Sequence, residues 1–122
     1  RTMSSIKRTC NRDCRAYVKS LTPFNTSSKP HAQNGTIFAR WTTPDTYVVY
    51  SYGTHWPLHI CVVNPDNGSR IWFSNEDKHS RTTSKHYGQA HPLVDTHRRS
   101  LSAMDQLTYM SYSQVIAQRL AG

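Results

Sequence analysis

Four short runs of β-branched and aromatic residues dominate the centre of the chain, between Thr36 and Ser74. Residues of these types favour strands, and the runs cover 37–41, 47–52, 58–63 and 71–73. The segments between them are rich in proline, glycine, asparagine and aspartate, which form tight turns. Connections this short join antiparallel neighbours, because a parallel pair needs a long crossover. The pattern therefore predicts a four-stranded antiparallel meander.

Two segments that flank the strands have the spacing of amphipathic helices. The first runs from Ser4 to Leu21 with basic residues on its other faces, and the second runs from about Ser102 to Leu120. Their apolar positions are Ile6, Cys10, Tyr17, Val18 and Leu21 in the first segment, and Leu101, Met104, Thr108, Tyr112, Val115 and Ile116 in the second. Ser102 with Asp105 resembles a capping box at the start of the second helix. Residues 25–35 have the composition of a loop.

The apolar sides of both helices need a surface to cover, and one face of the meander supplies it. We expect one α+β domain over residues 1–122, with an N-terminal helix, a four-stranded antiparallel sheet and a C-terminal helix packed on that sheet. No apolar run is long enough to cross a bilayer. We therefore expect no membrane association and a cytoplasmic location.

The charge balance is strongly basic. Lys and Arg number 15 against 7 Asp and Glu, giving a formal net charge of +8. The excess gathers in two stretches, one near the N-terminus and one between Arg70 and Arg99. Such a field favours a polyanionic partner, either nucleic acid or an acidic protein. The alternative is that surplus cations only keep a small protein in solution.

The run from Asn75 to Pro92 contains almost nothing apolar, so we expect it at the surface. Its centre gathers cations, hydroxyls and an imidazole: Arg81, Thr82, Thr83, Ser84, Lys85 and His86. Arginine offers a two-pronged donor, lysine a point charge and the hydroxyls short donors, which together suit phosphate. If the stretch is helical, Arg81 and Lys85 share one face, and Thr82 and His86 another. The alternative is a solvated, hydroxyl-rich loop.

Histidines gather in the same region, with His79, His86, His91 and His97 close in sequence and His55 and His59 around the second turn. Two imidazoles beside a cation would suit acid and base catalysis of RNA cleavage without a metal. Phosphate-binding glycine loops and the G-x-S-x-G elbow are absent from the sequence. We expect no cofactor and keep a small ribonuclease as an alternative.

The three cysteines are too few for a disulfide framework and fit a reducing compartment. Cys10 and Cys14 share a face if the first segment is helical, so a structural zinc site would need a histidine from elsewhere. No C-x-x-C pair supports it, and we expect Cys10 to be a small buried apolar residue.

Two pieces of the chain resemble a largely uncharacterised family of small proteins of tailed bacteriophages. The first is Tyr50 to Pro57, which reads YSYGTHWP, and the second is Arg81 to Gln89, which begins RTTSKH. The resemblance spans Tyr47 to Gln89, about the middle third of the chain. It implies a viral source and an accessory role in the host cytoplasm, and it implies no catalytic mechanism.

In a meander, the second turn and the exit of the fourth strand lie at the same end of the sheet. His55 is then expected near Arg81, Lys85 and His86. The alternative is that the hydroxyls cap a turn and pin it against the His55 loop.

The leading hypothesis is therefore a phage accessory protein that binds a polyanion, most simply nucleic acid, through Arg81 to His86 and His55, assisted by Arg8, Arg12 and Arg15. A second hypothesis is a protein-interaction module that inhibits a host enzyme or defence factor and uses the aromatic strands as hot spots. The third is the ribonuclease, using His86 with His55 or His79.

Overall fold

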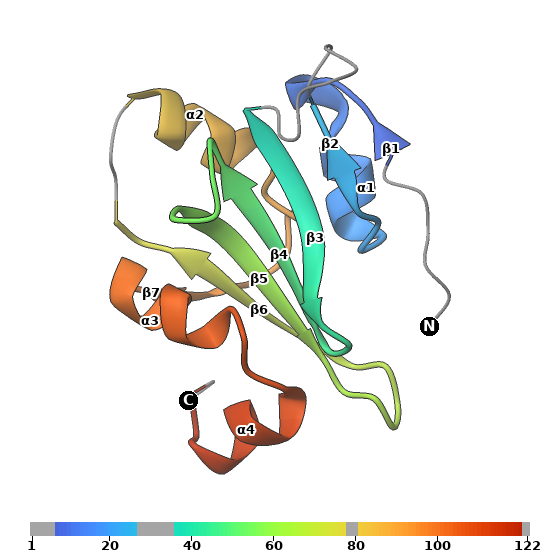
Figure 1. Cartoon of the computed structure of the whole chain (residues 1–122), viewed down its shortest axis with the longest axis vertical. Coiled ribbons are helices and arrows are strands. Elements are labelled where there is room, and N and C mark those ends of the chain that lie inside the picture. Colours follow the sequence, from blue (N-terminus) through green and yellow to red (C-terminus); the bar gives the residue numbers. More distant parts are fainter. Residues whose placement is uncertain (1–6, 27–35, 78–80, 121–122) are drawn as a thin grey trace.

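The computed structural model of the chain describes residues 7–26, 36–77 and 81–120. Its strands form one seven-stranded sheet whose spatial order follows the sequence (Figure 1). The strands are β1 (Lys7–Arg8), β2 (Phe24–Asn25), β3 (Ile37–Thr43), β4 (Thr46–Ser51), β5 (Pro57–Val63), β6 (Arg70–Asn75) and β7 (His97–Arg99). The helices of this part of the chain are α1 (Arg15–Lys19), α2 (Arg81–Gln89), α3 (Leu101–Leu107) and α4 (Tyr112–Ala117), and a 3-10 turn, η1 (Asn11–Asp13), precedes α1.

The middle of the sheet is antiparallel and is buried on both faces. β3 to β6 pair in sequence order, with Val48 opposite Ile60 in the β4–β5 pair. Because successive residues of a strand point to opposite faces, Tyr47 and Val49 enter one apolar cluster while Val48 and Tyr50 enter the other. A continuous apolar strand such as β4 therefore has a core on each side.

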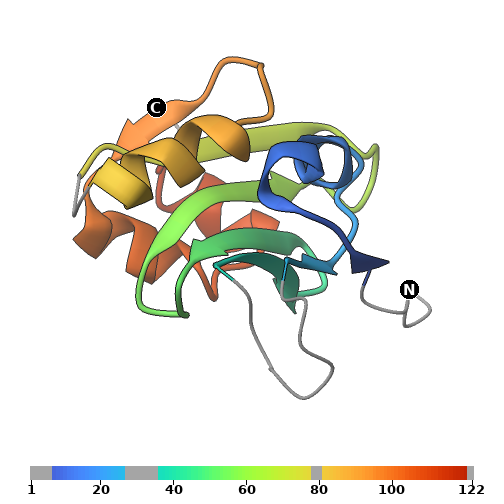
Figure 2. The ribbon, with the colours of Figure 1, turned by 90° about the horizontal axis from the view of Figure 1, so that it is seen from above.

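Parallel pairs close both edges of the sheet, because β1 pairs with β2 and β6 with β7 in parallel. Each pair is joined by a helical crossover, as parallel strands require. The two crossover helices lie next to each other on one side of the strands (Figure 2), where Val18 and Ala90 join the cluster of Tyr47. α3 and α4 cover the other face with Met104 and Val115. The result is a three-layer arrangement of helices, sheet and helices.

The expected fold class is wrong. The four predicted strands are present as β3 to β6, but the sheet is seven-stranded and mixed, and neither flanking segment is one helix. Ser4 to Leu21, where it is described, forms β1, η1 and α1. Leu21 has a φ of 56°, which takes the chain out of the helical region and ends this unit. Most of the predicted loop, 27–35, lies outside the described residues.

The C-terminal segment forms two helices because serines begin each of them. Ser100, rather than Ser102, caps α3 by accepting a hydrogen bond from the backbone N–H of Ala103. Ser111 makes a complete capping box with Gln114 at the start of α4. A serine that satisfies the first free N–H groups of a new helix interrupts the preceding one. The break before Ser111 thus divides the expected helix from Ser102 to Leu120.

None of the helices in the described ranges combines the length and the apolar character that a bilayer-spanning segment needs.

Candidate nucleic-acid interface

α2 contains the hydroxyl-rich block, and the helix turns part of this block into the protein. Thr83 and His86 are 4% and 3% exposed, and Ala90 just beyond the helix is fully buried. The prediction that the whole polar run lies at the surface is therefore wrong for these two polar residues and for Asn75, which is 3% exposed. Thr83 and His86 are three apart, which places them on one helix face. That face packs on the sheet.

The opposite face of α2 is exposed and carries Arg81, Thr82, Ser84 and Lys85. Arg81 and Lys85 are both exposed, as their spacing on one face predicts, and Thr82 is exposed although His86, one turn further along α2, is buried. Arg81 and Lys85 form no ion pair with any described residue. Both cations are therefore available to an external anion.

His86 joins α2 to β4 and η1. Its Nδ1 lies 2.8 Å from the Ser51 hydroxyl, and its Nε2 has a longer contact of 3.5 Å with the side-chain amide of Asn11. The amide oxygen of Asn11 accepts from the Thr36 hydroxyl at 3.1 Å, so its NH2 group faces the ring and Nδ1 carries the imidazole proton. Burial, with Lys85 beside it, lowers the pKa of His86. The neutral ring therefore links α2 to β4 through Ser51 and to η1 through Asn11.

His59 of β5 fixes the other half of α2. Its Nε2 donates to the carbonyl of Tyr87 at 3.0 Å, and its Nδ1 accepts from the Ser74 hydroxyl at 2.8 Å. The ring of Tyr87 lies 4.6 Å from the His59 ring, and that of His91 lies 5.2 Å away. Burial lowers the pKa of His59 to about 3, so this fully buried ring is neutral at physiological pH. These bonds hold α2 against β5 and β6.

Arg15 also serves the placement of α2. Its guanidinium donates to the carbonyls of Gly88 at 2.6 Å and His91 at 2.9 Å. These carbonyls lie at the end of α2, where carbonyl groups lack partners within the helix and a cation is favourable. The Arg15 side chain, predicted to assist binding, is engaged within the protein.

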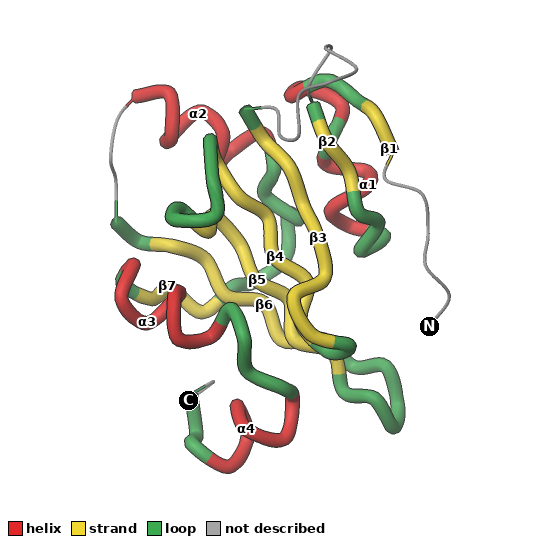
Figure 3. Tube along the Cα trace, viewed as in Figure 1, coloured by secondary structure: helices red, strands yellow, loops and turns green. Residues whose placement is uncertain are grey.

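The turn between β4 and β5, residues 52–56, lies beside α2 (Figure 3). The Tyr52 ring is 55% exposed and packs 5.2 Å from the ring of His86. A hollow of about 630 Å³ lies between the two segments, lined among others by His55 and Trp56 from the turn and Thr82 from α2. The prediction that the two segments meet is confirmed.

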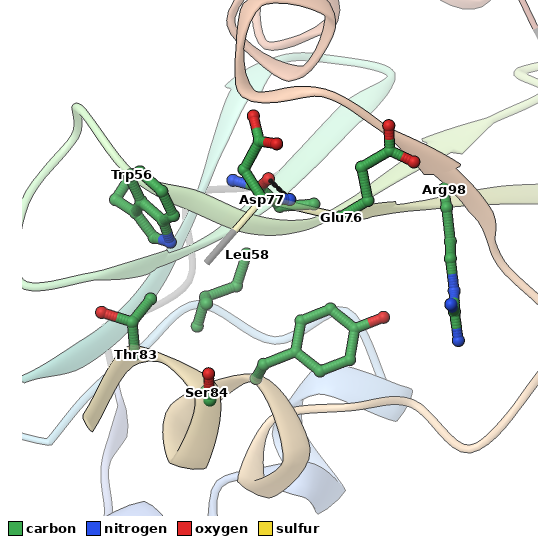
Figure 4. A pocket seen from close by; sticks show the side chains of 9 residues that line it. Trp56, Leu58, Glu76, Asp77, Thr83, Ser84 and Arg98 are labelled. Atoms are coloured by element: carbon green, nitrogen blue, oxygen red, sulfur yellow. Dashed lines mark hydrogen bonds between the residues drawn. The ribbon is translucent and has the colours of Figure 1, made fainter. Parts of the chain in front are cut away.

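A second, smaller hollow of about 270 Å³ adjoins the first, because Trp56 and Thr83 line both. Figure 4 shows Trp56 and Leu58 on the sheet side, Thr83 and Ser84 on α2, and Arg98 at the far side. Glu76 and Asp77 lie at its upper rim, and their carboxylates point away from Thr83 and Ser84. Asp77 is engaged elsewhere, because its Oδ2 accepts the backbone N–H of Leu101 at the start of α3.

The predicted basic residues near the N-terminus are only partly brought to this surface. Arg12 belongs to η1, which lies against α2, and its neighbour Asn11 contacts His86. Arg12 is exposed. Arg8 is exposed as well, but it lies on β1 at the opposite edge of the sheet from β6 and β7.

Several residues of this surface received no role from the sequence. Tyr52 and Trp56 belong to the turn that drew attention through His55, while Tyr87 and Arg98 gave no signal. The sequence signal that could have indicated an exposed aromatic residue is Tyr52, which stands next to Gly53 in a turn. Turns run over the surface of a protein, so an aromatic side chain in a turn is a candidate ligand contact.

The cysteines do not behave as expected. Cys10 is exposed, and its thiol donates to Asp13 at 3.0 Å, whereas Cys14 is buried. Cys10 is thus not the buried apolar residue predicted. No group of three or more metal-binding side chains occurs within the described ranges.

No protein-family model, curated protein or solved structure matches the chain.

Proposed function

We propose that this protein binds single-stranded nucleic acid as a polyanion, on a surface that we call the α2 face: Arg81, Thr82 and Lys85 of α2 with Tyr52 and His55 of the adjoining turn. One observation carries the proposal. Exposed, unpaired cations on α2 stand beside an exposed aromatic turn that packs on the same helix through the Tyr52–His86 contact.

The charge of the α2 face suits a phosphodiester backbone. Arg81 and Lys85 lie one helical turn apart, and the hydroxyl of Thr82 adds a short donor. Arg12 of η1 extends the positive field on the same side of the sheet. A net charge of +8 adds long-range attraction, which raises the rate of encounter with any polyanion.

The aromatic turn favours a single strand over a duplex. Bases of a single strand can stack on exposed tyrosine or tryptophan rings, whereas those of a duplex are already stacked on one another. Tyr52 is 55% exposed, and its contact with His86 holds one side of the ring. Little side-chain freedom is then lost when a base stacks on it.

The same observations weigh against the two other hypotheses. A ribonuclease would need two accessible imidazoles, but His86 is buried and has partners at both ring nitrogens. The hypothesis of a host-protein inhibitor needs exposed aromatic residues on the strands as binding hot spots. Tyr47, Tyr50 and Phe73 are instead buried in the core. Binding of an acidic host protein remains an outcome that the test below can reveal. The phage accessory role implied by the resemblance is part of this proposal.

The test is a binding titration of labelled single-stranded DNA and RNA at low salt, followed by fluorescence anisotropy. The variant pair Arg81→Gln and Lys85→Gln should weaken binding strongly, because it removes two phosphate contacts. The matched control, Arg40→Gln with Arg119→Gln, also removes two positive charges, but from the side of the sheet covered by α3 and α4. The Arg40 guanidinium lies over the Phe38 ring, and Arg119 is exposed. The control should retain nearly full affinity. The proposal is refuted if no complex forms at low salt, or if the variant and the control lose the same affinity for nucleic acid. If the protein instead binds an acidic protein and does not bind nucleic acid, protein docking is favoured.

A further inference from the structure

The smaller hollow beside the α2 face is lined by side chains that suit one flat ring. It opens between the end of β6 and α2, and Trp56 gives it a shared wall with the larger hollow. Leu58 is 1% exposed and lies at its sheet side (Figure 4). Tyr87 contributes a second, half-buried aromatic ring. Two aromatic side chains and an aliphatic one favour a planar, partly apolar ligand.

The aromatic wall from α2 is fixed before any ligand arrives. The Tyr87 ring packs against the rings of His59 at 4.6 Å and His91 at 5.6 Å. The backbone carbonyl of the same residue accepts the His59 Nε2–H. Both the ring and its backbone are therefore held, which reduces the conformational entropy lost on binding.

The rim supplies hydrogen-bonding groups of both kinds. The side chains of Glu76 and Arg98 make no hydrogen bond within the described residues, and Ser84 on α2 is exposed. Two other polar residues of the rim are engaged: Asn75 donates to the Pro57 carbonyl at 3.0 Å, and Asp77 accepts the backbone N–H of Leu101. A carboxylate accepts while a guanidinium donates, and a hydroxyl does both. This mixture matches the edge of a nucleobase, which carries donors and acceptors side by side.

The size and the mixed lining of the hollow favour a single small ring over larger ligands and free anions. Pockets for drug-sized molecules measure about 300–1,000 Å³, and this hollow of about 270 Å³ lies below that range. Arg98 would attract a free phosphate, but Leu58, Trp56 and the carboxylate of Glu76 do not favour an anion. A single base that remains attached to its strand fits better, because the backbone stays outside.

We infer that the hollow between Trp56 and Tyr87 takes one unstacked nucleobase of a strand whose backbone lies along Arg81 and Lys85. This inference rests on the proposed function. Trp56 and Thr83 line both hollows, so a strand on the α2 face can turn one base inward without leaving its phosphate contacts. The rim groups then read the edge of that base, so the protein discriminates among bases.

The experiment compares two kinds of fluorescently labelled strand. One kind is a short homopolymer of adenine, cytosine or thymine, and the other is an abasic strand with the same phosphodiester backbone. Trp56→Leu should weaken the best homopolymer by about 5- to 150-fold, the range for one lost stacking contact. It should leave the abasic strand unchanged. Trp56→Phe, which keeps an aromatic wall, should restore most of the affinity.

A second variant protects the test against loss of folding. Ser84 is exposed on α2, so Ser84→Phe should fill the hollow without disturbing the core. It should weaken the homopolymer and spare the abasic strand, as Trp56→Leu does. If both probes bind and these variants affect them equally or not at all, the base site is refuted while the proposed function stands. If neither probe binds the wild-type protein, the proposed function fails as well.

Discussion

The buried His59 makes the stability of the protein depend on pH in a calculable way. The ring is 0% exposed and spans β5, β6 and α2 through its two hydrogen bonds. Protonation of Nδ1 would replace its acceptor role toward Ser74 by a second donor and would place a charge in the core. The groups nearest the ring are Tyr87 and the imidazole of His91, which opposes a second positive charge. Acidification should therefore loosen α2 from the sheet.

The direction follows from the two pKa values. Burial lowers the pKa of His59 from its ordinary 6.5 to about 3 in the folded protein. Between these values the unfolded chain binds more protons, so the contribution of His59 is complete above pH 6.5 and is lost as the pH falls toward 3. At about pH 4.5 the loss is roughly 3 kcal/mol, and the slope approaches about 1.4 kcal/mol per pH unit. The pKa values of His86 and His91 are also lowered, so they add to the slope in the same direction.

Urea denaturation followed by tryptophan fluorescence, between about pH 7.5 and 4.5, measures this dependence. His59→Gln should lower the free energy of unfolding at neutral pH. It should also reduce the slope of that free energy against pH by up to about 1.4 kcal/mol per pH unit, because an amide cannot titrate. His55→Gln, at an exposed position of the turn outside the His59 network, is the matched control. If His59→Gln retained the full wild-type slope, the account of the His59 network would be refuted.

Two further predictions concern Arg15 and the three cysteines. Arg15→Ala should reduce the free energy of unfolding by about 1–3 kcal/mol, because the carbonyls of Gly88 and His91 lose a charged donor; Arg8→Ala, at an exposed position of β1, is the control, and a similar loss there would contradict the role of Arg15. A thiol reagent should modify Cys10 promptly in the native protein and the other two cysteines only after unfolding. Burial raises the pKa of Cys14 to about 11 and that of Cys61 to about 12, so rapid modification of more than one thiol would contradict this structure.

The centre of the fold could be predicted from the sequence, and its edges could not. β3 to β6 consist of β-branched and aromatic runs with turn residues between them, and such runs indicate strands. β1 and β2 have two residues each, Lys7–Arg8 and Phe24–Asn25, which is too short for any alternation to be visible. β7 is His97–Arg99, a wholly polar segment held by its parallel pairing with β6. Pairing between backbones, which composition does not record, created these strands.

The candidate site was predictable in its location and not in its orientation. Topology placed the turn of His55 beside the block of Arg81 to His86, and the contact of Tyr52 with His86 bears this out. The burial of His86 was hidden because an imidazole is polar in the sequence. It becomes an acceptable core residue only when Ser51 and Asn11, distant in the chain, satisfy its nitrogens. Which helix face points inward was therefore decided by tertiary contacts.

The central claim, that the α2 face holds a phosphodiester backbone, is tested most directly by the salt dependence of binding. A plot of the logarithm of the association constant against the logarithm of salt concentration gives a slope proportional to the number of phosphates neutralised. Removing Arg81 and Lys85 should make this slope shallower by about 1.4 for a single strand. The control variant at Arg40 and Arg119 should keep the wild-type slope. Identical slopes for the wild-type protein and the variant at Arg81 and Lys85 would contradict the claim.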